Sequence, residues 1–204
     1  MDYKKLHKFI GNIKEITILA GPSGCGKSTL AAHLGLENCI CPDKIEKSLC
    51  HIIDEKARQQ QASLAASTEV LKCIKEGKSF AWETTFASRH IPSFLVDAKK
   101  QNYKFNLHYV ATENTDICKA RVARRVMEGG HDVPHDIMVA RYKKSIALLP
   151  ELINFVDEAT IYDNSEHLYL FLKKDAGQIV KMGVVPHWAE YLVKTCKNER
   201  NMLE

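Results

Sequence analysis

Residues 21–29 read Gly21-Pro22-Ser23-Gly24-Cys25-Gly26-Lys27-Ser28-Thr29 and match the Walker A pattern, Gly-x4-Gly-Lys-Ser, without a mismatch. The backbone N–H groups of such a loop point inward around phosphate oxygens, and its glycines permit the tight curve. The apolar run 16–20 precedes the loop, and a segment of helical character, 27–36, follows it. We therefore predict that residues 21–29 bind ATP, with Lys27 on the β- and γ-phosphates and the Ser28 hydroxyl on Mg²⁺.

Outward from this loop, short apolar runs alternate with segments of helical periodicity. This alternation predicts an α/β protein of the P-loop class, a doubly wound and mainly parallel sheet with helices on both faces. We expect a single domain, 1–204, with a small lid at about 125–141 and a C-terminal hairpin and helix at about 166–204. The predicted strands are 16–20, 39–41, 80–82, 105–111 and 159–162, with a hairpin at 167–173 and 179–182. The predicted helices are 27–36, 44–76 in one or two pieces, 91–101, 115–128, 136–149 and 188–197.

The composition is that of an ordinary globular protein, with 204 residues and a formal net charge of +4. Such a mild charge suits an anionic ligand and does not require nucleic acid. No apolar run reaches the length of a membrane span, and the first residues lack the apolar core of a signal peptide. We expect a cytoplasmic protein whose seven cysteines are reduced thiols, because Cys39 and Cys41 lack the second pair of ligands that zinc requires.

Carboxylates follow several of the predicted strands, and the carboxyl ends of parallel strands meet at one edge of the sheet. Phosphoryl transfer needs a carboxylate for the acceptor hydroxyl and another near the metal. Asp43, after the strand 39–41, is the candidate base and contacts the substrate in this interpretation, although it equally suits an N-cap of the next helix. Glu83 and Thr84 are candidates for binding the substrate, and Glu83 also for holding the metal. Asp163 falls at the same edge.

Arginines gather around the pair Gly129-Gly130. Arg121 and Arg125 share one face of the predicted helix 115–128, and Arg141 follows the glycines. We expect these arginines to bind the nucleotide as part of a mobile lid, with Arg125 also assisting catalysis. His131 is a further candidate member of the lid, and plain solvent exposure is the alternative for each of these side chains.

The ordered set Gly21–Thr29, Asp43, Glu83-Thr84-Thr85, the run 125–134 (Arg-Val-x2-Gly-Gly-His-Asp-Val-Pro) and Tyr162-Asp163-Asn164-Ser165 resembles the zeta toxin family. The resemblance runs from about 16 to 165. It implies an ATP-dependent kinase, since zeta toxins phosphorylate a sugar hydroxyl of UDP-N-acetylglucosamine. It also implies that Lys27 binds phosphate, that Asp43 is the base and that Arg125 is the first nucleotide-binding arginine, with Arg141 the nearest candidate for the second. An antitoxin protein is a partner by analogy alone.

Three functions remain open at this point. The first is a kinase for a hydroxyl of a small metabolite, with a nucleotide sugar such as UDP-N-acetylglucosamine as one acceptor. The second is a polynucleotide 5′-hydroxyl kinase, which the sequence disfavours because only Tyr103-Lys104-Phe105 combines basic and aromatic residues. The third is a nucleotide-binding regulatory module with little catalysis. Consumption of ATP with different acceptors distinguishes them.

Overall fold

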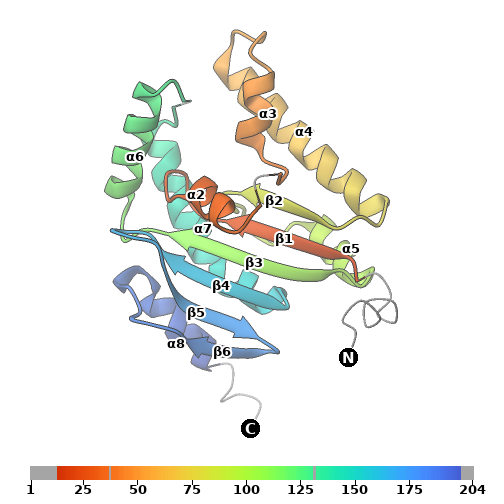
Figure 1. The fold of residues 1–204 in the computed structure, drawn as a ribbon, viewed down its shortest axis with the longest axis vertical. Helices are drawn as coiled ribbons and strands as arrows, with labels where there is room; N and C mark the ends of the chain where they lie inside the picture. Colours follow the sequence, from red (N-terminus) through yellow and green to blue (C-terminus); the bar gives the residue numbers. More distant parts are fainter. Residues whose placement is uncertain (1–12, 37, 131, 199–204) are drawn as a thin grey trace.

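The computed structural model describes residues 13–36, 38–130 and 132–198. Within this part of the chain a six-stranded sheet has the order β2-β1-β3-β4-β5-β6 (Figure 1). Strands β1 to β4 pair in parallel, whereas β5 and β6 are antiparallel to their neighbours. The strands are β1 (Glu15–Ala20), β2 (Phe80–Thr84), β3 (Lys104–Ala111), β4 (Glu158–Asp163), β5 (Tyr169–Asp175) and β6 (Gln178–Lys181). The predicted P-loop fold with a mainly parallel sheet is confirmed.

The helices connect these strands and enclose the sheet. They are α2 (Lys27–His33), α3 (Pro42–Ser48), α4 (Glu55–Lys75), α5 (Ser93–Lys100), α6 (Thr115–Met127), α7 (His135–Phe155), the 3₁₀ helix η1 (His187–Ala189) and α8 (Glu190–Asn198). None of those in the described part of the chain is long and apolar enough to span a bilayer.

Two apolar clusters lie on opposite faces of the sheet. The larger cluster packs α4, α5, α7 and α8 against alternate strand residues such as Ile18, Leu107 and Ile161. The smaller cluster packs α2 and α6 against Leu19 and Val110, near the carboxyl ends of β1 and β3. Helices therefore cover both faces, as predicted, but they cover them unequally.

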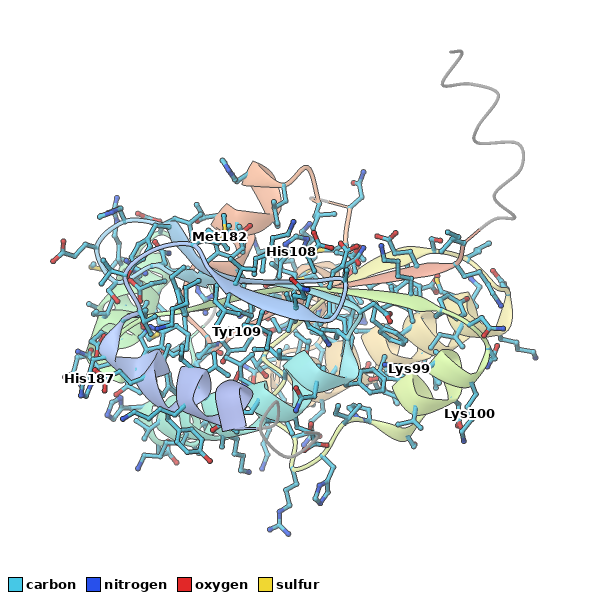
Figure 2. The ribbon with its side chains drawn as sticks, turned by 90° about the horizontal axis from the view of Figure 1, so that it is seen from below. Lys99, Lys100, His108, Tyr109, Met182 and His187 are labelled. Atoms are coloured by element: carbon cyan, nitrogen blue, oxygen red, sulfur yellow. The ribbon has the colours of Figure 1, made fainter. Side chains whose placement is uncertain are left out.

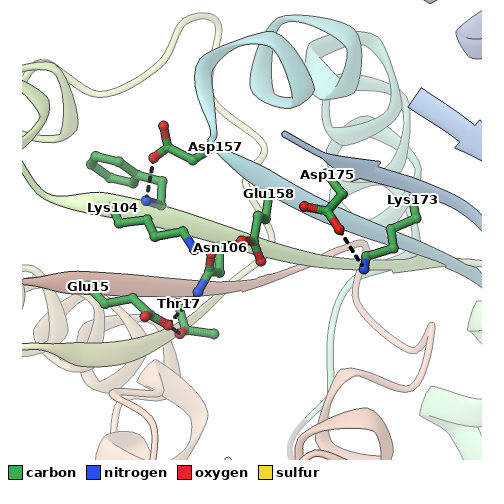
Figure 3. Close-up of polar contacts among 9 residues, drawn as sticks. Glu15, Thr17, Lys104, Asn106, Asp157, Glu158, Lys173 and Asp175 are labelled. Carbon is green, nitrogen blue, oxygen red and sulfur yellow. Dashed lines mark hydrogen bonds and ion pairs between the residues drawn. The ribbon is translucent and has the colours of Figure 1, made fainter. Parts of the chain in front are cut away.

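The less covered face is polar where α2 and α6 do not reach. Thr17, Asn106 and Glu158 lie side by side in register across β1, β3 and β4. Asn106 donates a hydrogen bond to Glu15, and Lys104 forms an ion pair of 2.6 Å with Glu158 (Figure 3). Polar side chains that bind one another can face water without an apolar cover. The phosphate loop and its helix thus stand over only the carboxyl-terminal half of this face.

Consecutive residues of β3 show the contrast directly. Tyr109 lies on the side covered by α7 and α8, where its hydroxyl forms a hydrogen bond of 2.9 Å with Ser145 and its ring lies 6.4 Å from that of Trp188. His108 points to the opposite side, which carries α2 (Figure 2). Its Nδ1 lies 2.6 Å from the hydroxyl of Thr160. Strand geometry alone produces this alternation, because successive side chains of a strand point to opposite faces.

Two expectations about the elements need correction. The predicted strand 39–41 is a single bridge, in which Ile40 pairs with Trp82 of β2. It is too short to form a ladder because Pro42, which lacks an N–H, begins α3 directly after it. The predicted helix 136–149 continues to Phe155 with Pro150 inside it. The proline follows four helical turns whose buried side chains hold the helix on the sheet, so packing outweighs the lost hydrogen bond.

Candidate functional site

The phosphate loop joins β1 to α2 and depends on glycine at defined positions. Gly21, Gly24 and Gly26 have φ angles of 143°, 80° and 102°, which side chains of L-residues rarely tolerate. A Cβ atom at Gly21 would lie 2.0 Å from the carbonyl oxygen of Val110. A Cβ atom at Gly26 would lie 2.3 Å from the side-chain nitrogen of Asn164. The loop is therefore shaped by its own backbone and by close neighbours on β3 and in the turn after β4.

The polar groups of the loop surround its centre. Lys27 Nζ donates a hydrogen bond of 3.0 Å across the loop to the carbonyl oxygen of Pro22. Ser28 and Thr29 are exposed in the first turn of α2, whereas Ser23 is buried. The N-cap of α2 is Gly26, which has no side chain that could cap the first N–H groups of the helix. This arrangement suits a phosphate chain, and the Ser28 hydroxyl is an oxygen ligand of the kind that Mg²⁺ takes.

The turn after β4 supports the loop from outside the motif. Asn164 donates a hydrogen bond of 2.8 Å from its side chain to the carbonyl oxygen of Cys25. Asp163, only 3% exposed, accepts hydrogen bonds from the backbone N–H of Ser165 at 2.9 Å and from the indole N–H of Trp188 at 2.7 Å. The C-terminal elements are thereby connected to the phosphate loop. Sequence reasoning placed Asp163 at this edge and included Asn164 in a motif without a role. It gave Trp188 no role either, because the partners of both side chains lie far away in the chain.

The same turn holds one of the predicted arginines. The carbonyl oxygen of Ser165 accepts a hydrogen bond of 3.2 Å from Arg121 Nη2. The Ser165 hydroxyl accepts one of 2.8 Å from the N–H of Glu113. Arg121 Nη1 is buried and has no hydrogen-bond partner among the described residues. The guanidinium is therefore fixed beside the loop and keeps N–H groups that could bind a ligand, although Arg121 does not line the cavity beside the loop.

A cavity of about 480 Å³ opens beside the phosphate loop. It brings together Lys27, Asp43, Glu83, Thr84 and Arg141, which belong to four different elements, α2, α3, β2 and α7. Of the three carboxylates expected beside the loop, Asp43 and Glu83 line this cavity, whereas Asp163 lines another one. The remaining lining residues come mostly from α3, α4 and α7, among them Glu46, Gln59, Ser63, Ser67, Ile137 and Lys144.

Asp43 stands at the mouth of this cavity. It occupies the first turn of α3, whose N-cap is Cys41 in an extended conformation without a side-chain cap. The alternative that Asp43 caps this helix is therefore wrong. Its carboxylate, half exposed, lies 3.8 Å from Arg125 Nη1. Arg125 reaches from α6, so this ion pair joins the two helical regions on either side of the phosphate loop.

Glu83 is the buried carboxylate of the cavity. It belongs to β2, where it pairs with Leu19 of β1, and it is 4% exposed. Its backbone N–H donates a hydrogen bond of 2.8 Å to the carbonyl oxygen of Ile40. Burial raises the pKa of the Cys25 thiol to about 12, against the nearby positive charge of Lys27, while the charge of Glu83 adds to the rise. Lys27 within the loop and Glu83 beside it therefore have opposite effects on the pKa of this thiol, and Glu83 could supply a carboxylate to a metal near the phosphates.

The connection after Glu83 is strained. Phe86 has a φ angle of 47°, in the left-handed region, and its side chain is buried. Thr84 Oγ1 accepts a hydrogen bond of 3.1 Å from the N–H of Phe86. The Phe86 ring lies 6.1 Å from that of Trp82. Such a conformation costs about 1–3 kcal/mol and persists where surrounding contacts enforce it. Here those contacts turn Thr84 and Thr85 into the cavity.

The glycine pair 129–130 ends α6 and positions Arg125. Gly129 has a φ angle of 83°, and its N–H donates to Val126 O at 2.9 Å. The N–H of Gly130 donates to Arg125 O at 2.8 Å, which completes a Schellman motif. A Cβ atom at Gly130 would lie 2.5 Å from Arg125 Cγ. Gly130 thus gives the arginine stem room to turn toward Asp43, while the mobility predicted for this segment stays a prediction. His131 lies outside the described residues.

A second cavity of about 810 Å³ lies beside the Asp163 turn. It is lined by carboxylates of Glu113, Asp163 and Glu166, and by the rings of His167 and Tyr169. No lysine or arginine of the described chain lines it. Its charge opposes phosphate binding, so the phosphate chemistry concentrates at the loop and in the first cavity.

Comparisons with known proteins agree with this architecture. The model of the family described as AAA domain matches residues 16–149. An uncharacterized protein of Haemophilus influenzae is 32% identical over 128 residues, which cover 60% of this chain and 88% of that protein. The structure of AvrRxo1-ORF1:-ORF2 with ATP superposes with a TM-score of 0.70 at 14% identity, over 91% of this chain and 64% of that chain. This chain is thus similar to less than two thirds of that longer one.

A structure of the PezAT chromosomal toxin–antitoxin system of Streptococcus pneumoniae is similar over almost the whole chain. The TM-score is 0.58 at 14% identity, over 98% of this chain and 93% of that chain. The resemblance to zeta toxins is thereby confirmed at the level of the fold. Because the family model extends from β1 through the phosphate loop to α7, the chain belongs to the AAA domain family of P-loop proteins and has the fold of zeta-toxin-like P-loop kinases.

Proposed function

We propose that the protein is a kinase that transfers the γ-phosphoryl group of ATP to a hydroxyl of a small metabolite. One observation carries the proposal: a single cavity beside the phosphate loop contains Lys27, the half-exposed carboxylate of Asp43 and the buried carboxylate of Glu83. A module that only binds a nucleotide has no need of an additional cavity with acidic groups beside its phosphate loop. The AvrRxo1-ORF1:-ORF2 structure with ATP supports ATP as the nucleotide.

In this proposal the loop holds the phosphates and the cavity holds the acceptor. The backbone N–H groups of residues 21–29 and Lys27 bind the β- and γ-phosphates. Ser28 and Glu83 would hold Mg²⁺, which neutralises phosphate charge when bound. Asp43 accepts the proton of the acceptor hydroxyl as its oxygen bonds to the γ-phosphorus, and the bond from that phosphorus to the oxygen of ADP breaks.

Arg125 has a double role in the proposal. Its guanidinium now lies 3.8 Å from Asp43, at the mouth of the loop. The γ-phosphate of ATP carries more charge than one carboxylate and would compete for the same guanidinium. Binding of ATP would thus free Asp43 for the acceptor and place a positive charge where negative charge develops during transfer.

The size of the cavity favours a small acceptor. About 480 Å³ lies within the range of sites for small molecules, and nucleotide sugars such as UDP-N-acetylglucosamine are the acceptors to test first. A cavity of this volume suits a small molecule better than the extended backbone of a polynucleotide. By analogy with the PezAT system, an antitoxin protein is a proposed partner and the cytoplasm the proposed location.

The test is ATP consumption and transfer of labelled γ-phosphate with nucleotide sugars, nucleosides, sugar phosphates and 5′-hydroxyl oligonucleotides. We expect transfer to at least one small metabolite, and loss of that transfer in Lys27→Ala. Transfer only to oligonucleotides would select the polynucleotide kinase instead. ATP binding without transfer to any acceptor would select the regulatory module.

A further inference from the structure

One wall of the acceptor cavity is a face of α7. Ile137, Ala140, Arg141 and Lys144 recur at helical spacing and all line the cavity. The apolar pair lies nearer the N-terminus of the helix, and the two cations follow one turn later. Lys143 and Lys144 are both exposed, but only Lys144 lines the cavity. The helix therefore directs two positive charges at the space beside the phosphate loop.

The charges of the cavity are unevenly matched. Glu46 forms an ion pair of 3.3 Å with Arg58, and Asp43 lies 3.8 Å from Arg125. Glu83, the third acid of the lining, lies deep beside the phosphate loop and is buried. By contrast, neither Arg141 nor Lys144 forms an ion pair within the described residues. The α7 wall thus carries two cations that form no direct ion pair with an acid of the described chain.

The part of the lining formed by α4 carries no charge that would compete for these cations. It is the face of α4 that carries Gln59, Ala62, Ser63, Ala66 and Ser67 at helical spacing. Their side chains are short or neutral, so they fill little of the cavity and add no negative charge. Arg58, which also belongs to α4, is held by Glu46 and by the carbonyl oxygen of Ile52 at 3.1 Å. This contact joins α3 to α4, and Arg58 itself does not line the cavity.

We propose that Arg141 and Lys144 form an anion subsite for the acceptor, so that the substrate carries a phosphate group in addition to the hydroxyl that is phosphorylated. This inference rests on the proposed kinase function. Arginine binds a phosphate with two parallel hydrogen bonds and lysine adds a point charge, a combination suited to an anion and indifferent to a neutral sugar. The subsite differs from the phosphate loop, which holds the phosphates of ATP with Lys27 and backbone N–H groups.

The subsite also assigns Arg141 to the acceptor rather than to the nucleotide. Arg121 touches the turn after β4, and Arg125 reaches Asp43 across the loop. Arg141 alone of these three lines the acceptor cavity, where it shares a helix face with Lys144. The sequence analysis assigned all three arginines to the nucleotide. Loss of Arg141 should weaken nucleotide binding under that assignment, and acceptor binding under the present one.

The deciding experiment measures anion binding while the phosphate loop is filled. The protein is saturated with Mg²⁺ and a non-hydrolysable ATP analogue, and glucose 1-phosphate, glucuronate and glucose are titrated by calorimetry. We expect saturable binding of glucose 1-phosphate, weaker binding of glucuronate and none of glucose. Lys144→Met should weaken binding of glucose 1-phosphate by ~10-fold or more, the scale of a charge-assisted hydrogen bond. Lys143→Met, the same charge change one residue away, should leave it unchanged.

The outcomes separate the subsite from the kinase proposal. A protein that does not bind the ATP analogue at all contradicts the proposed function. A protein that binds the analogue but no anion in addition, or that binds the anion equally in Lys144→Met, contradicts only the subsite. In Arg141→Met, lost anion binding with retained analogue binding supports the subsite. Lost analogue binding would instead assign Arg141 to the nucleotide and overturn it.

Discussion

The phosphate loop and the acceptor cavity adjoin each other but are built in different ways. The loop is one continuous segment, and its shape follows from glycines at positive φ and from backbone N–H groups. The cavity is assembled from side chains of α3, α4, β2 and α7, which packing of the fold brings together. Substitutions in the loop should therefore remove function as a whole, whereas substitutions in the cavity should change single steps or single substrates.

The largest effect is expected for Lys27→Ala. Its ammonium crosses the loop to Pro22 and is the side-chain cation at the phosphate-binding centre. We expect loss of tight Mg-ATP binding and a fall in turnover of roughly 10²–10³-fold, the scale for removing one preorganised donor. Calorimetry with a non-hydrolysable ATP analogue and a turnover assay measure both. Lys143→Ala is the control, and unchanged binding and turnover in Lys27→Ala would contradict the assignment of the loop.

Asp43→Asn tests whether a substitution in the acceptor cavity affects phosphoryl transfer without affecting ATP binding. Because Asp43 does not cap α3, the amide should leave the melting temperature nearly unchanged. An amide cannot accept the proton, so transfer should fall by ~10² while ATP affinity changes little. Transfer of labelled γ-phosphate to the acceptor found in the panel is the measurement. Transfer at the wild-type rate would show that the base lies elsewhere, and Glu83 would be the next candidate.

Trp188→Phe tests the support of the loop from outside its motif. The change keeps a ring against Phe171 but removes the N–H that binds the buried carboxylate of Asp163 at 2.7 Å. Loss of a hydrogen bond to a charged group costs about 1.5–3 kcal/mol. We expect a lower melting temperature and a several-fold rise in KM for ATP with kcat less affected. His187→Ala, which removes an exposed contact with Glu113, is the matched control. A lower melting temperature with unchanged KM would mean that the turn is only structural.

The smallest effect concerns thiol reactivity within the loop. Burial raises the pKa of Cys25 to about 12, so the protonated thiol persists at any pH well below that value. Alkylation requires the thiolate, and we expect iodoacetamide at pH 8 to modify the exposed Cys50 long before Cys25. Peptide mass spectrometry reads both sites in one experiment, and unfolding in guanidinium should remove the difference. Equal rates in the folded protein would mean that the loop opens readily.

Much of the fold, and part of the candidate site, can be predicted from short segments of the sequence. Residues 21–29 predicted strand, loop and helix together, because a Walker loop has one backbone shape and works only in that context. The alternation of apolar runs with helical segments predicted the mainly parallel sheet. Because the carboxyl ends of parallel strands meet at one edge, the positions of Asp43 and Glu83 after predicted strands also indicated that they lie near the loop. Local periodicity was insufficient for residues 39–41, where an apolar run of strand type forms only one bridge because a proline begins the next helix.

Other features exist only in the folded chain. Asn164 meets Cys25, and Trp188 meets Asp163, only because β4 and the C-terminal elements are brought to the phosphate loop. The cavity and its cationic α7 wall likewise depend on where α4 and α7 are placed by the larger apolar cluster. Backbone conformation is dictated by neighbouring residues and can be read from a contiguous motif. Side-chain groupings depend on packing between distant segments, and therefore only the tertiary structure decided which residues share the site.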